Sequence, residues 1–158
     1  MYRIMYKTLV CSLLFLIQNI SVEAQTNSYQ SDKEEKLRKE SPFTKIINRE
    51  LPATIEYEDD DLIAFVPLRK QAPVHLLIVP KKPIPTINDL IGEDTLVVGR
   101  MVLLAKQLAK SNGIAQTGYR LAFNTNEDAG QSVFHIHLHL LGGKNLGPMV
   151  SQDYDPTK

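Results

Sequence analysis

This chain of 158 residues contains no tryptophan and a single cysteine, and its 18 basic residues are balanced by 18 acidic ones. One cysteine cannot form an intramolecular disulfide and supplies no set of thiolates for a zinc site. A net charge of zero gives no basic field of the kind that holds nucleic acid. Internal repeats and low-complexity tracts are absent as well. With 43% hydrophobic residues, the chain is typical of one small globular domain.

A long hydrophobic run is also missing. The most apolar stretch, Thr8–Ile20, is shorter than the ~20 residues that a membrane-spanning helix needs. It follows a basic start and precedes Val22-Glu23-Ala24, which has small residues at the two positions that signal cleavage requires. We expect residues 1–24 to be a cleaved signal peptide, with an uncleaved anchor as the alternative. After cleavage of the signal peptide the protein would be periplasmic or secreted, without stable membrane association. Cys11 would be lost with the peptide.

The rest of the chain divides into a leader, a domain and a tail. Residues 25–40 are polar and charged and predict a flexible leader, in which Asp32–Lys39 is compatible with a frayed helix. Residues 41–145 carry the apolar patterning of a folded domain, and 146–158 form a C-terminal tail.

Within the domain, two helices and five strands are expected. Ser41 followed by Pro42 predicts a helix that continues to Arg49, because a hydroxyl N-cap and a proline at the first position favour a helix start. Apolar residues recur at helical spacing over Asp94–Ser111. The predicted strands are Thr54–Glu58, Asp61–Val66, Val74–Val79, Tyr119–Asn124 and Phe134–Leu141. This order indicates an α+β fold with a mainly antiparallel five-stranded sheet.

The most informative segment is 131–143, which holds three of the four histidines at two-residue spacing: His135, His137 and His139. Alternate side chains of a strand share a face, so these rings would line one ridge, with successive Cα atoms roughly 6.5–7 Å apart. The apolar residues between them would face a core; they are Phe134, Ile136, Leu138 and Leu140. Imidazole acts as nucleophile, base or acid near neutral pH, so the ridge predicts a reaction centre. A purely structural role and a zinc site are the alternatives, although no cysteine or well-placed carboxylate accompanies the histidines.

Such a ridge suits displacement at phosphorus. A neutral imidazole that attacks a phosphoryl centre forms a covalent phosphoramidate and replaces one difficult step by two easier ones. The attacking ring needs its other nitrogen fixed by an acceptor. The phosphoryl oxygens need donors, and the leaving group needs a proton. The middle histidine is the natural nucleophile, and residues 130–133 offer a turn with free backbone N–H groups and a hydroxyl.

The run resembles the His-x-His-x-His signature of the histidine-triad (HIT) superfamily. Its flanking Gly-Gln-Ser-Val and Leu-Gly-Gly resemble the Hint branch, whose members are nucleoside phosphoramidate and adenylyl hydrolases. The resemblance extends over about residues 41–143 in several separate matches that keep the family's order. They include Phe43-Thr44-Lys45-Ile46-Ile47, Tyr57-Glu58-Asp59-Asp60 and the stretch from Gln71 to Lys82.

The resemblance implies a role for each matching position. His137 matches the nucleophile, His139 and Ser132 match residues that contact the phosphate and assist departure of the leaving group, and His135 matches an orienting position. His75 matches a fourth histidine on an adjacent strand, and Asn124 matches a polar residue near the phosphate and ribose. The remaining positions expected to line the substrate are Gln131, Val133, Phe43, Ile46 and Leu68.

Two departures from the family pattern stand out. The pattern expects a carboxylate, which binds the ribose hydroxyls, two residues after Phe65, and this chain has Pro67 there. A proline side chain can neither donate nor accept a hydrogen bond. The tail also lacks the tryptophan-containing ending of Hint relatives, which leaves the preference for leaving groups open.

The expected function is therefore metal-independent hydrolysis of nucleoside phosphoramidates or adenylyl conjugates, with a nucleotide-like small molecule as the partner and no cofactor. Three alternatives stay open: a dinucleoside polyphosphate hydrolase, a nucleotidyl transferase, and a nucleotide-binding protein whose activity has decayed. Resemblance to Hint proteins also implies a two-fold homodimer, for which the apolar faces at Val97-Val98 and Met101-Val102 are compatible.

Overall fold

The computed structural model describes residues 28, 30, 31 and 33–149. It separates the chain into two units, 1–39 and 40–158. In the first unit the described residues up to Arg38 are helical, and Glu34–Arg38 and Glu35–Lys39 form ion pairs one turn apart. The predicted signal peptide and most of the predicted tail lie outside the described residues.

A search of the described part of the chain finds no helix with the length and apolar character that crossing a membrane requires.

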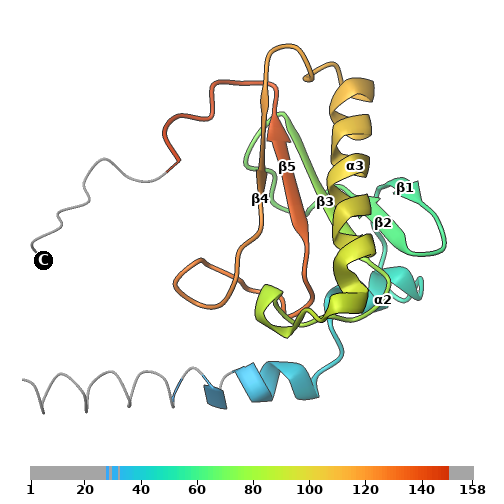
Figure 1. The fold of residues 1–158 in the computed structure, drawn as a ribbon, viewed down its shortest axis with the longest axis vertical. Helices are drawn as coiled ribbons and strands as arrows, with labels where there is room; N and C mark the ends of the chain where they lie inside the picture. Colours follow the sequence, from blue (N-terminus) through green and yellow to red (C-terminus); the bar gives the residue numbers. More distant parts are fainter. Residues whose placement is uncertain (1–27, 29, 32, 150–158) are drawn as a thin grey trace, which may run out of the picture. The chain divides into compact units, whose positions relative to one another are not determined.

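The second unit is built on a five-stranded sheet (Figure 1). Its strands are β1 (Ile55–Glu58), β2 (Leu62–Phe65), β3 (Val74–Pro80), β4 (Tyr119–Ala122) and β5 (Leu138–Gly142). They lie in the order β1-β2-β3-β5-β4, and every neighbouring pair is antiparallel. The predicted α+β architecture with two helices is confirmed.

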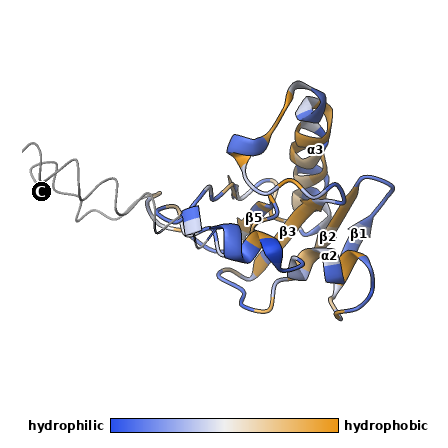
Figure 2. Cartoon of the chain, turned by 90° about the horizontal axis from the view of Figure 1, so that it is seen from below, coloured by the Kyte–Doolittle hydropathy of each residue, from blue (hydrophilic) through white to orange (hydrophobic). Residues whose placement is uncertain are grey.

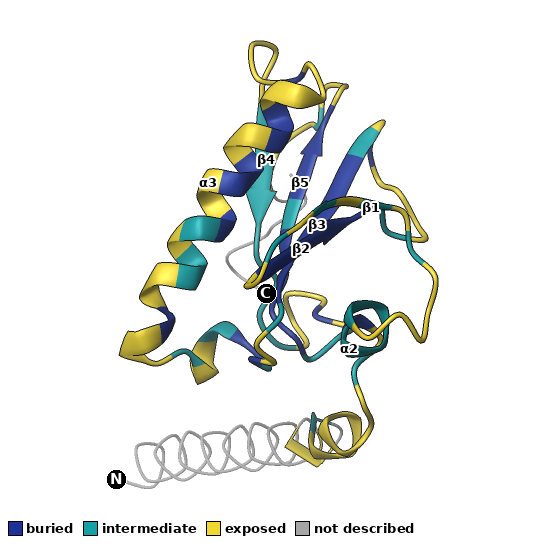
Figure 3. Cartoon of the chain, turned by 90° about the vertical axis from the view of Figure 1, so that its right-hand side faces the viewer, coloured by how far each residue is buried: buried dark blue, intermediate teal, exposed yellow. Residues whose placement is uncertain are grey.

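Helix α3 (Thr95–Ser111) covers one face of this sheet (Figure 1). Its inward side is buried and its outward side is exposed along its length (Figure 3). The core beneath it consists of alternate residues of β2, β3 and β5 packed on the helix: Leu62, Ala64, Leu76, Ile78, Leu138, Leu140, Met101, Leu104, Ala105 and Leu108. The central strands are correspondingly hydrophobic and the connecting loops mostly hydrophilic (Figure 2).

Helix α2 (Pro42–Ile47) packs on the opposite face through Phe43, which joins a second cluster with Ile63, Phe65, Leu77 and Val79. The Ser41 hydroxyl accepts a hydrogen bond from the Phe43 N–H at 3.1 Å, as the predicted N-cap requires. The helix ends at Ile47, two residues earlier than predicted, because the backbone reverses at Arg49, whose φ is 66°. Residues of the two sheet faces alternate along β2 and β3, so this second face is also the one that carries His75.

Strand β5 begins at Leu138, four residues later than predicted. Before that point the chain leaves the sheet, because the Ile136 N–H bonds to the Ile84 carbonyl at 2.7 Å and not to a neighbouring strand. His135 and His137 therefore precede the strand, and only His139 lies within it. The alternation still holds: Ile136, Leu138 and Leu140 are buried in the α3 core. Phe134 is only half-buried. The bounds of the other strands and of α3 agree with the prediction to within two residues.

Candidate active site

All four histidines lie along strand β3, on the face opposite α3. His75 belongs to β3 itself, and His139 pairs with Leu77 across the β3–β5 ladder. His135 reaches the end of β3, where its Nε2 lies 2.7 Å from the Pro80 carbonyl oxygen. The fold thus brings together the three clustered histidines and the fourth, which is distant in sequence.

His137 presents one free ring nitrogen. Its Nδ1 lies 2.8 Å from the carbonyl oxygen of His135, and only an N–H can bond to a carbonyl, so Nδ1 carries the proton. Nε2 is then unprotonated, and it makes no hydrogen bond within the described residues. The Phe43 ring meets the imidazole edge-on with centroids 5.1 Å apart. This contact forms an apolar wall beside the His137 ring.

His139 has the opposite tautomer, which a chain of hydrogen bonds determines. The Gln71 backbone N–H donates to His75 Nδ1 at 3.1 Å, so a neutral His75 must carry its proton on Nε2. That Nε2 lies 2.9 Å from His139 Nδ1, which must accept. His139 therefore carries its proton on Nε2, a buried atom without a hydrogen-bond partner in the described structure. A buried N–H of this kind is a donor that a phosphoryl oxygen would satisfy.

His135 anchors the group. Its ring is buried, its Nε2–H donates to the Pro80 carbonyl, and its own carbonyl accepts from His137. The ring of Phe43 lies 6.1 Å away between centroids. His135 consequently fixes the orientation of His137 through its backbone, and its side chain ties the segment to β3.

Burial lowers the pKa of all four histidines below the ordinary value of 6.5. Burial is the largest cause of the lowered pKa of each histidine, because it disfavours the charged form of the ring. The charges of His137 and His75 add to this effect at His139 and bring its pKa to about 4. The rings are therefore neutral at neutral pH, which is the state that a nucleophilic imidazole needs.

The loop before the histidines is held by Gln131. Its side-chain oxygen accepts from the Asn126 N–H at 2.9 Å, and its amide nitrogen donates to the carbonyls of Pro85 and Val133 at 2.8 and 3.1 Å. Gln131 is buried, and these bonds commit its amide to the loop, in contrast to the predicted contact with substrate. Ser132, next in sequence, is exposed with its hydroxyl available.

The other predicted substrate positions differ in their surroundings. Ile46 and Val133 pack at the edge of the Phe43 cluster, and Asn124 is half-buried just beyond β4. Leu68 is fully exposed in the loop between β2 and β3. Gln71 is the residue that sequence reasoning missed, because it contributes a backbone N–H and no side-chain pattern could reveal it.

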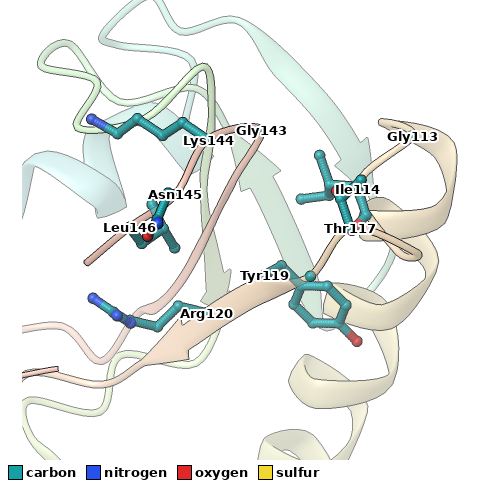
Figure 4. Close-up of a pocket in the computed structure, with 10 residues that line it drawn as sticks. Gly113, Ile114, Thr117, Tyr119, Arg120, Gly143, Lys144, Asn145 and Leu146 are labelled. Atoms are coloured by element: carbon teal, nitrogen blue, oxygen red, sulfur yellow. The ribbon is translucent and has the colours of Figure 1, made fainter. Parts of the chain in front are cut away.

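A separate cavity of ≈ 770 Å³ lies at the edge strand β4, between the end of α3 and the segment after β5 (Figure 4). Its lining includes Ile114, Tyr119, Arg120 and Lys144. None of the predicted site residues contributes to it. The histidine site is thus distinct from this cavity.

Among the described residues, no group of three or more histidine, cysteine, aspartate or glutamate side chains has a geometry that could hold a metal ion. His75 Nε2 and His139 Nδ1 hydrogen-bond to each other. His135 Nε2 and His137 Nδ1 each bond to a backbone carbonyl oxygen.

Comparison with known proteins places this site in a family. The model of the HIT domain matches residues 48–146. The purine nucleoside phosphoramidase of Escherichia coli (strain K12) is 50% identical over 115 residues, which cover 73% of this chain and 97% of that protein.

Solved structures of HIT family hydrolases are also similar to this chain. A HIT family hydrolase from Legionella pneumophila is 50% identical, with a TM-score of 0.65 and coverage of 66% of this chain and 94% of its own. A HIT family hydrolase from Clostridium thermocellum is 42% identical, with a TM-score of 0.69 and coverage of 72% and 98%. The extent of the domain match and the identity to these relatives show that this chain belongs to the HIT family.

Proposed function

We propose that this protein is a metal-independent hydrolase of nucleoside phosphoramidates or adenylyl conjugates that works through a covalent nucleotidyl-histidine at His137. One observation carries the proposal: the His135 carbonyl holds His137 in the tautomer whose Nε2 is unprotonated and free. The E. coli relative, named a purine nucleoside phosphoramidase, supports the choice of bond.

In the first step the Nε2 lone pair of His137 forms a bond to phosphorus while the bond from phosphorus to the leaving nitrogen breaks. The leaving amine takes a proton from solvent. The modified imidazole becomes positively charged, and its Nδ1–H still donates to the His135 carbonyl, which stabilises that charge.

In the second step water attacks the same phosphorus, the bond to His137 breaks, and the proton of the water returns to solvent. The products are a nucleoside monophosphate and a free amine. His137 recovers its original tautomer because the His135 carbonyl never releases Nδ1–H.

His139 and Ser132 stabilise the charge that develops on the phosphoryl oxygens in both steps. His139 offers an Nε2–H whose direction is fixed by His75 and the Gln71 backbone. Preorganised donors of this kind lower the barrier because they need no reorientation during the reaction. His75 acts through His139 and is a positioning residue.

The test is a turnover panel of nucleoside phosphoramidates, adenylyl conjugates, dinucleoside polyphosphates and non-nucleoside phosphoramidates, run with and without a chelator. We expect the first two classes to be preferred and chelation to have no effect. His137→Ala should lower kcat by more than ~10³-fold with the fold retained, because the covalent route is lost. Activity that follows zinc content, or near-normal turnover by His137→Ala, would contradict the proposal.

We also propose that the protein is a homodimer. Leu96, Val102 and Leu103 are exposed on the outer side of α3, and β4 is an edge strand that pairs on one side only within the described part of the chain. Apolar side chains in solvent and open strand edges both favour pairing between copies.

A further inference from the structure

We infer that the substrate carries a second phosphate group, bound by Arg69 and Lys70 at the His75 end of the histidine site. This inference rests on the proposed function, because it extends the same site beyond the phosphoryl group under attack. It is argued from charge, pairing and position in the loop between β2 and β3.

The loop is in direct contact with the histidine cluster through the positioning residue His75. Its Gln71 N–H donates to His75 Nδ1, and His75 in turn bonds to His139. Lys70 precedes Gln71 in the chain, and its charge adds to the effect of burial in lowering the pKa of His75. The loop backbone at Gln71 is thus one imidazole, that of His75, away from His139, and Arg69 and Lys70 directly precede it in the chain.

Arg69 and Lys70 have no ion-pair partner among the described residues, and both are exposed. Four other basic side chains of the domain form ion pairs: Arg49 and Lys81 with Glu58, Lys82 with Asp94, and Arg100 with Asp59 and Asp61. Lys106 and Lys110, which also form no ion pair among the described residues, lie on α3, across the sheet from the histidines. No aspartate or glutamate occurs anywhere in residues 62–88. The free cations therefore create a local positive field in a chain of zero net charge.

Two acidic residues, Glu127 and Asp128, lie toward the other end of β3. Glu127 and Asp128 belong to the loop that Gln131 fastens to Pro85, beyond the C-terminal end of β3. Loop 66–73 enters β3 at its N-terminal end. Because β3 has 7 residues, roughly 20 Å of strand separates the two loops at 3.3 Å per residue. An additional anionic group is thus attracted to the Arg69–Lys70 end and not to the other.

Arginine and lysine in this arrangement match a phosphate, which accepts several charge-assisted hydrogen bonds. A nucleotide could carry this second phosphate on its sugar or beyond the reacting phosphorus, in the leaving group. Both sources present the same chemistry to the loop.

The test measures dissociation constants for AMP, adenosine 3′,5′-bisphosphate and ADP. The first has one phosphate, the second has its extra phosphate on the sugar, and the third has it on the leaving-group side. We expect one of the two nucleotides with an extra phosphate to bind at least ~10-fold more tightly than AMP, by charge-assisted bonds. The advantage should shrink as salt rises, because exposed charges are screened.

The double variant R69Q/K70Q should lose this advantage, and R69K/K70R should keep most of it. K106Q/K110Q is the matched control, because both lysines are exposed on α3, across the sheet from the site, and the advantage should survive there. The inference would be overturned if neither adenosine 3′,5′-bisphosphate nor ADP bound better than AMP, or if the advantage persisted in R69Q/K70Q. Absence of phosphoramidate turnover with normal AMP binding would instead count against the proposed function.

Discussion

At the scale of the residue, four chemically identical imidazoles are made different by the atoms that their nitrogens meet. His137 donates its Nδ1–H to a carbonyl and keeps Nε2 unprotonated, as its proposed role as nucleophile requires. His139 receives a ring N–H at Nδ1 and keeps a proton on Nε2 as a donor. The partners, and not the residue type, therefore assign the roles.

A single position is also expected to determine how the sugar is read. Proline at position 67 replaces the carboxylate that the HIT resemblance implies for the ribose hydroxyls, so wild-type protein should discriminate weakly between ribose and 2′-deoxyribose. A site that bonds to a hydroxyl rejects the analogue lacking it, whereas a site without that partner cannot. Pro67→Asp should restore a ribose preference of roughly 10-fold or more, since a charge-assisted bond contributes about 1.5–3 kcal/mol.

The measurement is kcat/KM for matched ribo- and deoxyribo-adenosine phosphoramidates with both proteins. A strong ribose preference in the unmodified protein would show that another residue, such as Asn124, makes the contact.

At the scale of the element, the loop 126–133 depends on one side chain. Gln131 bonds to Asn126, Pro85 and Val133 and so connects this loop to the segment after β3. Ser132, with its hydroxyl, and the start of the histidine run come directly after Gln131 in the chain. Local order in this loop is thus a condition for the geometry of the site.

Gln131→Ala should destabilise the protein by about 1–3 kcal/mol, because it leaves the Pro85 and Val133 carbonyls and the Asn126 N–H without their partner. Urea unfolding measures the loss, and hydrogen exchange should show increased opening in 126–133. Gln107→Ala is the control, because Gln107 is exposed on α3, and it should change stability by less than ~0.5 kcal/mol. Equal effects of the two substitutions would show that the Gln131 bonds contribute little.

At the scale of the whole molecule, the buried histidines couple folding to pH. Their pKa values lie below 6.5 in the folded protein and return to about 6.5 on unfolding. Between these values the unfolded chain binds more protons, so stability falls as pH falls from about 6.5 to about 4.

The pH dependence of stability should therefore show a loss in this window, to which His139 contributes at most about 3 kcal/mol for its shift to about 4. Thermal unfolding at a series of pH values measures the slope, and His139→Asn should reduce it. A midpoint that stays constant between these pH values would contradict neutral burial of the rings.

The proposed dimer gives a prediction about mass. Light scattering after size exclusion should give twice the mass of one chain. Leu103→Lys should shift the equilibrium toward the monomer, because it places a charge in the exposed apolar side of α3. Leu51→Lys, an exposed leucine outside α3, should leave the mass unchanged. A wild-type monomer at micromolar concentration would exclude the dimer.

Export remains a prediction from sequence. Mass spectrometry of the protein from its native source should give an N-terminus at or near Gln25. An intact Met1 on protein recovered from the cytosol would be evidence against a signal peptide.

The sequence by itself determined the family, the architecture and the identity of the histidines. Each of these depends on a local pattern: the two-residue spacing at 135–139, the helical spacing over 95–111, and the Ser-Pro start of α2. Only the tertiary structure decided that His135 and His137 precede β5, that Gln131 serves its own loop, and that the Gln71 backbone fixes the His75 tautomer. Those features depend on hydrogen bonds between atoms far apart in the chain, and backbone donors and acceptors are the same at every position, so no sequence pattern can specify which of them meet.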